Sequence, residues 1–555
     1  SASPAPRQHM LWRVLLSNLP FALALSVVSE LPEFLQVLTV GGVLFFAPGL
    51  AWADRRPGDA FLVLFRTVMS SLVAALLTWV VVGILPGDTS RIGFLLVLAA
   101  ITNVGLYVGF RRGFYTRAPF ADPLFRAIGV VVVLFFLQEY VGAAYTIPPM
   151  EDQDMETQGT SYGLIHAFSP TMATNRGSRF FFAHPLLLHF YIGASAFITD
   201  DLDRLRYFHE SSLAVRDGAE LGGRWEQDFH QFERDPVLLP TRTPNLFFGV
   251  MVLFPLGFLI YRMSRSKVAA IGAGVLYATF PEIYVRSAYG GYMAITNFIM
   301  LSGAYYYLIA SGLLREPGDP EPAVAKRRSM ATTFLGAWTN QKAILIPAAA
   351  GLHATLLLLL DGGFKQLVAR AKKSPLFTTA VLATIGFILG WITYAAYGVS
   401  VAPKDFIADH IRDHIYKRLK MSDVNLKDVQ KGAWVYPSIL ALWLQFAKHY
   451  GWLFFGSAIV AAVATIKRIR RAEGVFLFWL AFGALGFSLV DWRQTKHLSK
   501  IVAPMVILTA LFWASLDGRA KKALSAVLAA AIVWNVWSVA QTMRDFTYIQ
   551  PLPIW

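Results

Sequence analysis

Long apolar runs recur along almost the whole chain and limit the folds that are open to it. The 555-residue sequence is 55% hydrophobic and only 15% charged. Runs of about 18 residues or more, such as those near 60–85 and 376–398, have the length that a helix needs to cross a bilayer. A transmembrane barrel would instead show short segments of alternating hydrophobicity. The sequence therefore predicts an all-α polytopic membrane protein.

The net charge of +15 has a simple explanation in a membrane protein. Lys and Arg accumulate in cytoplasmic loops and beside anionic lipid headgroups. No basic run is interleaved with aromatic residues in the manner of a nucleic-acid-binding surface, so membrane lipids rather than nucleic acid are the expected partners. The sequence contains no cysteine, which excludes disulfide bonds and thiolate chemistry.

Basic residues in the loops orient the predicted N-terminal helices. The charged loops at Asp54–Pro57 and 111–126 alternate with loops that carry no Lys or Arg. By the positive-inside rule, the N-terminus and the loop 111–126 are cytoplasmic, so a span near 124–147 leads outward. We therefore predict a multi-pass protein of the plasma (inner) membrane, with the segment 148–183 and the active site on the extracytoplasmic side.

The chain divides into two predicted parts. Residues 1–120 are expected to form an N-terminal four-helix transmembrane module, and residues 121–555 a transmembrane core. At the usual length per span, the whole chain has room for about 13–15 transmembrane helices. The polar parts of the core are an acidic loop at 148–183, a hydrophilic segment at 199–243 and an extracytoplasmic loop at 399–435.

The middle of the core allows two topologies. Three basic segments there favour the cytoplasmic side, namely Arg262–Lys267, Lys326–Arg328 and Lys365–Lys373. All three reach that side if 331–360 is a re-entrant or broken hairpin with Asn340-Gln341-Lys342 at its tip, and if 184–198 dips into the membrane without crossing it. The alternative keeps 184–198 as a full span and leaves some basic loops on the wrong side. We favour the hairpin.

The loop after the span near 124–147 concentrates acidic residues beside the membrane. It contains Glu151, Asp152, Asp154 and Glu156, and charge at such a boundary is costly unless it faces water or has a function. In an extended loop, Asp152 and Asp154 project to the same face, so one can act as general base while the other orients an acceptor hydroxyl. The pair would also allow, without requiring, a divalent cation such as Mg²⁺ or Mn²⁺. Glu156 is a third candidate, and a merely solvated acidic loop is the plain alternative.

Three groups of cations lie where predicted spans meet the outer side. Lys342 is a lone ammonium within GAWTNQKAILIPAA, and Arg286 lies within FPEIYVRSAYGGY. Arg493, Lys496 and His497 form a cluster at the start of a later span. A buried Lys requires an anion, and Arg can hold a phosphate through two hydrogen bonds. Snorkelling near helix ends explains any one of these cations, but together they predict a phosphate-bearing ligand.

A histidine pair in DFIADHIRDHIYKR is a weaker candidate for a site. His410 and His414, each preceded by Asp, are four residues apart and would share one face of a helix. That spacing could bind a metal ion. An amphipathic helix at the membrane surface explains it more simply.

Several motifs follow one another in an order that resembles a known family. FAHPLLLHFYIGA follows the acidic loop, and LPTRTPNLFFG contains an Arg-x-Pro-x-x-x-x-Gly pattern. LGAWTNQKAILIPAA and RQTKHLSKIVAPMVIL come later in the chain. Together, over roughly 124–517, they resemble the lipid-linked-sugar glycosyltransferases of the GT-C fold, the relatives of protein O-mannosyltransferases and aminoarabinose transferases. Leu186 replaces the second Pro of one family motif, and the family's Asp-Glu pair is Glu-Asp-Gln-Asp here, which leaves Asp152 or Asp154 as the catalytic residue.

The resemblance implies a GT-C fold with an extracytoplasmic catalytic loop and short juxtamembrane helices. It also implies that a sugar passes, with inversion, from a polyprenyl-phosphate donor of undecaprenyl or decaprenyl type to a glycan, lipid or protein acceptor. Asp152 or Asp154 would deprotonate the acceptor, and Lys342, Arg493 and Lys496 would stabilise the phosphate charge. Further candidates for donor binding are His497, Arg286, His184 and Tyr162.

Two other functions are compatible with a membrane protein of this composition. One is a transporter or flippase for a lipid-linked anionic substrate, which would also need outer cations and acids. The sequence contains no internal repeat of the kind found in many transporters, which weighs against it. The other is a non-catalytic assembly subunit that holds the lipid tail in the same way, in a groove between helices.

Overall fold

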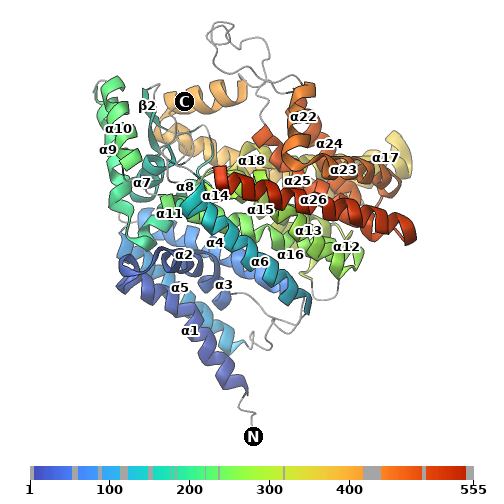
Figure 1. Ribbon diagram of the computed structural model, residues 1–555, viewed down its shortest axis with the longest axis horizontal. Coiled ribbons are helices and arrows are strands. Elements are labelled where there is room, and N and C mark those ends of the chain that lie inside the picture. The colour runs from blue at the N-terminus through green and yellow to red at the C-terminus, as the bar shows by residue number, and fades with distance from the viewer. Residues whose placement is uncertain are drawn as a thin grey trace.

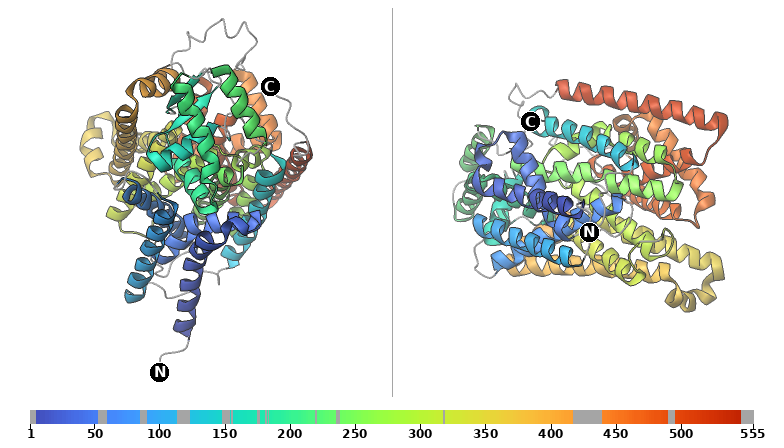
Figure 2. Two further views of the ribbon diagram at one scale, coloured as in Figure 1. Left: turned by 90° about the vertical axis from the view of Figure 1, so that its left-hand side faces the viewer. Right: turned by 90° about the horizontal axis from the view of Figure 1, so that it is seen from below.

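A computed structural model describes most of the chain as a bundle of long helices (Figure 1, Figure 2). The described residues are 5–52, 60–84, 90–112, 123–147, 154, 156–174, 177–180, 182, 184–218, 221–234, 238–316, 319–416, 439–489 and 495–545. Within these ranges, 10 helices are long and apolar enough to cross a membrane, or up to 12 if each of two bent pairs is one span. Three shorter apolar helices accompany them. The predicted all-α polytopic fold is therefore confirmed.

The N-terminal part packs directly on the rest of the bundle. Its elements are α1 (Ala5–Ser26), η1 (Val28–Glu30), α2 (Glu33–Gly41), η2 (Gly42–Phe46), α3 (Ala47–Trp52), α4 (Ala60–Ile84) and α5 (Arg91–Arg111). Phe45 stacks on Phe247 at 5.1 Å between ring centroids, and Arg91 donates to the carbonyl oxygen of Phe197 at 2.7 Å. Helix α1 projects away from the bundle and exposes Leu11 and Trp12, as expected of a helix that faces lipid (Figure 1).

A polar cap covers one end of the bundle. It consists of α7 (Glu156–Ala167), the antiparallel strands β1 (Thr171–Thr174) and β2 (Gly177–Phe180), α9 (Leu202–Arg216) and α10 (Leu221–Arg234), which Figure 1 shows together at its upper left. The hairpin pairs Thr171 with Phe180 and was not predicted. Beneath the cap lies α8 (Leu187–Thr199), whose 13 residues are all buried. A helix this short does not meet the length of a full span, which agrees with the favoured topology.

The central helices run between the polar cap and the opposite end of the bundle. They are α6 (Pro123–Val141) with η4 (Gly142–Thr146), α11 (Leu238–Met251), α12 (Leu253–Ser264), α13 (Lys267–Ala278), α14 (Pro281–Ala288) and α15 (Met293–Ala310). The α13–α14 pair bends by 67°. Helix α12 ends far from the cap, where Nη1 of Arg262 lies 2.5 Å from Oδ2 of Asp319. This ion pair places the basic segment after α12 at the same end as the segment after α15.

Helices α16 (Pro322–Thr339) and α17 (Leu345–Lys373) form the predicted broken hairpin. Asn340 leaves the helical region with φ −166° and ψ 141°, and its side chain accepts a hydrogen bond from the backbone N–H of Lys342 at 3.0 Å. The turn η6 (Gln341–Ile344) follows. A polar residue that binds its own backbone in this way competes with the helix and ends it. Helix α16 has 18 residues, and α17 is broken at Gly363, whose φ is 63°, so residues 345–362 form the arm that follows the turn.

Two glycines bring α18 (Pro375–Val401) into direct contact with α16. A Cβ atom at Gly386 would collide with the carbonyl oxygen of Met330, and one at Gly390 with that of Phe334. Since small residues let helix backbones approach closely in membranes, these two positions fix α16 against α18.

The C-terminal part completes the bundle. Its elements are α19 (Pro403–Phe406), η7 (Ile407–Tyr416), α22 (Ile439–Tyr450), α23 (Trp452–Thr465), η8 (Ile466–Arg468), α24 (Glu473–Leu489), α25 (Thr495–Ala514) and α26 (Gly518–Asp545). The α22–α23 pair bends by 111° at Gly451, whose φ of 85° suits glycine. Helix α26 exposes Val533, Trp534 and Trp537, which is the pattern of a lipid-facing surface.

Candidate active site

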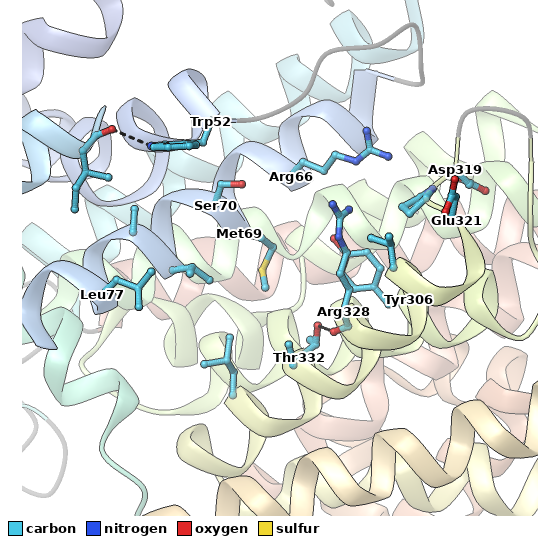
Figure 3. Close-up of a pocket in the computed structure, with 17 residues that line it drawn as sticks. Trp52, Arg66, Met69, Ser70, Leu77, Tyr306, Asp319, Glu321, Arg328 and Thr332 are labelled. Atoms are coloured by element: carbon cyan, nitrogen blue, oxygen red, sulfur yellow. Dashed lines mark hydrogen bonds between the residues drawn. The ribbon is translucent and has the colours of Figure 1, made fainter. Parts of the chain in front are cut away.

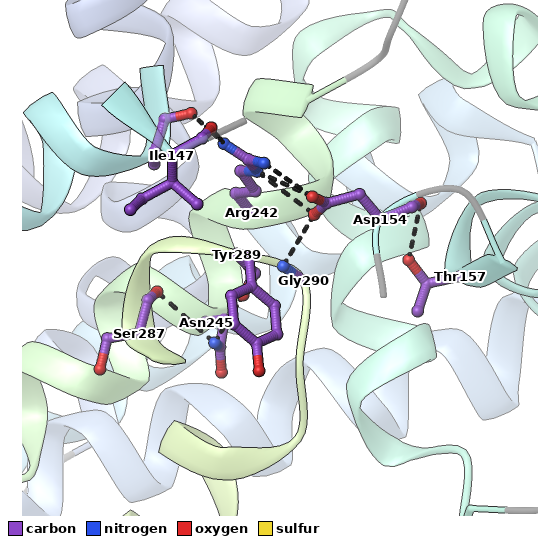
Figure 4. Close-up of polar contacts among 9 residues, drawn as sticks. Ile147, Asp154, Thr157, Arg242, Asn245, Ser287, Tyr289 and Gly290 are labelled. Carbon is purple, nitrogen blue, oxygen red and sulfur yellow. Dashed lines mark hydrogen bonds and ion pairs between the residues drawn. The ribbon is translucent and has the colours of Figure 1, made fainter. Parts of the chain in front are cut away.

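Asp154 and Arg242 form an ion pair that is closed to solvent (Figure 4). Both side chains have 0% exposure, and Nη2 of Arg242 lies 2.7 Å from Oδ2 of Asp154. Nε of Arg242 donates to the same carboxylate, at 3.2 Å from Oδ1 and 3.3 Å from Oδ2. The backbone N–H of Gly290 donates to Oδ1 at 2.9 Å. Both oxygens of Asp154 therefore accept charge-assisted or backbone hydrogen bonds.

Arg242 also connects the end of the outward span to the acidic loop. Its Nη1 donates to the carbonyl oxygens of Ala143 and Ile147, at 2.8 and 2.7 Å. With Nε and Nη2 on Asp154, each of its three nitrogens has a partner. Such complete pairing is what makes a buried charge tolerable. Helix α11 begins at Leu238, inside the predicted hydrophilic segment 199–243, and can include Arg242 because its charge is neutralised inside the protein.

Asn245, one helical turn after Arg242, holds the segment that reaches Asp154. Its side-chain amide donates to the carbonyl oxygens of Arg286 and Tyr289, at 2.8 and 2.7 Å. The next residue, Gly290, then places its N–H on Asp154. Residues three apart lie on one face of a helix, so α11 uses one face for the acid and for its supporting segment.

The geometry around Asp154 favours a positioning role. A general base needs a lone pair that faces the acceptor hydroxyl. The carboxylate of Asp154 instead points at Arg242 and Gly290, and its backbone carbonyl accepts from the hydroxyl of Thr157 at 3.1 Å. Asp152, the other candidate base, lies outside the described residues. An anchored Asp154 would fix the loop that carries Asp152.

The segment before α15 also contacts the predicted His-Pro region. Nε2 of His189 lies 2.6 Å from the hydroxyl of Tyr292. The ring centroids of His184 and Tyr292 are 4.5 Å apart. His184, a predicted donor-binding residue, is half-buried and contacts Tyr292, two residues after Gly290.

Three basic groups meet at the start of α25. Nζ of Lys342 lies 2.5 Å from Nδ1 of His497, and His497 is mostly buried. One turn later, Nζ of the buried Lys500 donates to the carbonyl oxygen of Met293 at 3.1 Å. Met293 begins α15, three residues after Gly290. The predicted residues Lys342 and His497 are thus brought to the same end of α15 as Asp154.

Arg286 joins this region with its charge already balanced. Its Nε lies 2.7 Å from Oε1 of Glu282, and its Nη1 donates to the hydroxyl of Tyr289. Arg286 is therefore paired within the protein and adds no free cation to the group at the start of α25.

Several predicted residues are elsewhere or are not described. Asp152 and Arg493 lie outside the described residues, as do the side chains of Glu156 and Lys496. Tyr162 lies in the polar cap, where its ring is 5.1 Å from His166 and 5.2 Å from His209. The structure therefore groups Tyr162 with the cap histidines rather than with the cations.

Sequence reasoning missed Arg242, Lys500 and Tyr292. Arg242 belongs to the Arg-x-Pro motif that carried the family resemblance, and Lys500 follows His497 in TKHLSK. Both motifs were therefore available as signals. Tyr292 lies in AYGGYMA, and nothing in the pattern distinguishes it from the many other tyrosines of the chain.

The donor set at Asp154 does not suit a metal ion. Its oxygens already accept from Arg242 and Gly290, so a cation would have to displace a guanidinium. In the part of the chain that the structure describes, no three His, Asp or Glu side chains are grouped so that they could hold a metal ion.

The Asp409-His410 pair acts as a clamp. Oδ2 of Asp409 accepts from the backbone N–H of Phe182 at 3.1 Å. Nδ1 of His410 lies 3.1 Å from the carbonyl oxygen of Phe182, and the indole N–H of Trp391 donates to its Nε2 at 3.1 Å. Both ring nitrogens of His410 therefore have protein partners, and the side chain of His414 is not described. The clamp holds η7 against the residues that precede His184.

Comparisons with known proteins were made for the sequence and for the structure. No protein-family model matches the sequence, and no curated protein matches it. The crystal structure of ArnT from Cupriavidus metallidurans bound to undecaprenyl phosphate is similar, with a TM-score of 0.50 and 13% identity over 76% of this chain and 70% of that one. An Archaeoglobus fulgidus oligosaccharyltransferase in the apo form has a TM-score of 0.44 and 14% identity, over 76% of this chain and 56% of that one. The chain has the GT-C fold that it shares with ArnT.

Proposed function

We propose that the protein is an integral membrane glycosyltransferase that transfers a sugar from a polyprenyl-phosphate donor to an extracytoplasmic acceptor, with inversion at the anomeric carbon. The shared fold supports this function, because the ArnT crystal structure contains undecaprenyl phosphate. The many apolar helices offer surfaces for a polyprenyl tail. The ordered motifs of the sequence point to the same class of enzyme.

One observation carries the proposal. The segment 289–293 touches the acidic loop through Gly290 and the cationic start of α25 through Met293. An anchored acid and a group of cations thus lie at one end of the bundle. A reaction between a hydroxyl and a phosphate-linked sugar needs both a base and a positive site for the leaving phosphate.

The proposed reaction assigns a step to each group. Asp152 takes the proton of an acceptor hydroxyl, whose oxygen attacks C1 of the sugar from the face opposite the phosphate. The bond from C1 to the phosphate oxygen breaks, and polyprenyl phosphate leaves with the bonding electrons. Lys342 and Lys500 stabilise the negative charge that develops on this phosphate.

Asp154, Arg242 and His497 have supporting roles in this scheme. The closed ion pair of Asp154 and Arg242 fixes the loop two residues after Asp152. The Nδ1 atom of His497 accepts from the ammonium of Lys342 and so holds it in place. Preorganised charges of this kind lower the barrier because they need no reorientation when the phosphate leaves.

The test compares two neighbouring acids in the full-length protein reconstituted in nanodiscs. With a panel of polyprenyl-phosphate sugars, Asp152→Asn is expected to lower turnover by about 10²–10⁴-fold, the usual contribution of a general base. Binding of polyprenyl phosphate is expected to survive. Glu151→Gln removes the same charge from the adjacent position and should stay close to wild type.

Two outcomes would contradict the proposal. If Asp152→Asn and Glu151→Gln lower turnover equally, Asp152 is not the general base. Movement of intact lipid-linked sugar between leaflets, with no cleavage at C1 by the wild type, would establish a transporter instead.

A further inference from the structure

A second polar region lies at the opposite end of α15 from Asp154. A cavity of about 790 Å³ there is bounded on one side by α3, α4 and α5 and on the other by α15, α16 and the turn before α16 (Figure 3). Tyr306, which lines the cavity, lies 13 residues along α15 from Met293, a distance of about 20 Å, so the polar end of the cavity is far from the segment 289–293. The cavity is therefore distinct from the candidate active site.

The cavity is polar at one end and apolar along its length. Arg66 and Arg328 reach its polar end, and Figure 3 shows Leu77 at the far end of the same space. Met69 and Val73 of α4 line the wall between them. Arg66 and Leu77 are eleven residues apart on one helix, which corresponds to about 16 Å. This is the profile of a lipid, with a charged head and a long apolar tail.

The apolar wall opens sideways. Val73 and Leu77 line the cavity, yet they are 41% and 57% exposed. Both lie in the span Val63–Gly83, so their exposed sides face the bilayer. A molecule can enter from the membrane without passing through water.

Two arginines and two acids line the polar end, and one arginine there has an unsatisfied donor. Asp319 lines it, but its Oδ2 is already 2.5 Å from Nη1 of Arg262. Arg328 stacks over the ring of Tyr306 at 5.8 Å, and its buried Nη1 has no hydrogen-bond partner among the described residues. Glu321 is exposed at the rim. A buried guanidinium N–H with no partner is costly, and a phosphate oxygen would satisfy it.

We propose that this groove binds an anionic phospholipid from the leaflet opposite Asp154. Its phosphate lies between Arg66 and Arg328, and one acyl chain follows Met69, Val73 and Leu77. A headgroup with its own ammonium would bring a third cation beside the two guanidinium groups, so a net negative headgroup is favoured. The lipid joins α4 of the N-terminal part to α16 of the core. The inference does not depend on the proposed glycosyl transfer.

Native mass spectrometry of the full-length protein in detergent tests this site. We expect phosphatidylglycerol to bind more tightly than phosphatidylcholine and to raise the melting temperature. Arg328→Gln is expected to weaken phosphatidylglycerol binding by about tenfold, the value of one charge-assisted hydrogen bond. Arg327→Gln is the matched control, since Arg327 is exposed on the same helix and does not line the cavity. It should bind like the wild type.

A second variant tests the tail independently of charge. Val73→Trp fills the apolar wall and should reduce phosphatidylglycerol binding while the lipid-free protein stays folded. If Arg328→Gln does not fold, Arg66→Gln and Val73→Trp decide the matter.

The proposal is overturned if the two phospholipids bind equally, or if Arg328→Gln and Arg327→Gln behave alike. It is also overturned if polyprenyl phosphate competes for this groove more strongly than phosphatidylglycerol, because the ligand would then belong to another lipid class.

Discussion

Arg242 and Arg328 lie at opposite ends of the helix bundle and differ in what satisfies their N–H groups. Each nitrogen of Arg242 donates to Asp154 or to a carbonyl oxygen of the preceding span. Arg328 rests on Tyr306, and its Nη1 faces a cavity with no hydrogen-bond partner in the described part of the chain. The first arginine is therefore a part of the framework, and the second is a site that is ready for a ligand.

The difference shows how a membrane protein can use the same side chain for stability or for binding. Arg242 has no exposure and Arg328 is half-buried, but burial alone does not say whether an N–H donor is paired. The two uses are distinguished by how many N–H donors of each guanidinium have a partner within the protein. A charge whose donors are all paired within the protein has nothing left for a ligand, whereas an unpaired donor gains by binding one.

The largest effect is expected where the pairing is complete. Asp154→Asn or Arg242→Met should each lower the free energy of unfolding by about 3–5 kcal/mol, because each leaves one buried charge alone. The double variant Asp154→Leu with Arg242→Met should lose clearly less than the sum. Denaturant titration in mixed micelles measures all of these. If each single variant loses almost no free energy of unfolding, the Asp154–Arg242 pair does not stabilise the fold, and Arg242 would resemble Arg328.

Lys342 tests whether the active-site cations belong to the binding group. It is half-buried and contacts His497, so Lys342→Met should cost little stability. Turnover should fall by about 10²–10³-fold, as when one preorganised donor to a developing charge is removed. Lys404→Met, at an exposed position of α19, is the control and should leave turnover unchanged. A loss of stability as large as that of Asp154→Asn would move Lys342 into the framework.

His209 extends the comparison to a buried group that is satisfied without a counter-charge. Nδ1 of His209 lies 2.5 Å from the hydroxyl of Thr171. Burial, and then repulsion from His166, lower the pKa of His209 to about 4 from its ordinary 6.5. The unfolded chain therefore takes up the proton first as the pH falls.

Stability should consequently be complete above about pH 6.5 and decline towards pH 4, by at most about 3 kcal/mol. Thermal unfolding across this range should show the decline in the wild type and in His230→Gln, whose histidine is exposed. His209→Gln should flatten it. An unchanged pH profile in His209→Gln would assign the decline to another group.

The smallest effect is expected at Arg328 itself. In lipid-free detergent, Arg328→Gln removes only the contact with Tyr306, so the free energy of unfolding should change by about 1 kcal/mol or less. Arg242→Gln should change it several times more. Similar values in the two variants would end the distinction between the two arginines.

The fold was largely predictable because each apolar run must bury its own backbone hydrogen bonds in a helix. The break at Asn340 was predictable for the same reason, since a run of polar residues interrupts an otherwise apolar segment. The hairpin β1–β2 was not, because its two strands lie in a polar region where periodicity carries little information. The start of α11 was missed because the charge of Arg242 looked like a loop signal.

The site was predictable only in its residue types. Asp154 and Arg242 are 88 residues apart in the sequence, and no local pattern states which acid meets which cation. Lys496, His497 and Lys500 all lie within one turn and a half of α25, and packing alone decides that Lys500 faces Met293. The sequence therefore predicts which charged residues are involved. The three-dimensional contacts show which of them stabilise the fold and which are candidates for binding a ligand.

Helix α16 carries Arg328 near one end, and the chain turns at the other end to reach Lys342. Because Gly386 and Gly390 let α18 lie directly on its backbone, α16 behaves as part of one stiff rod. Two helices packed in this way must tilt together in the membrane. Lipid binding at Arg328 would therefore be felt at the ammonium of Lys342, so the composition of one leaflet would become a variable of the chemistry at the other.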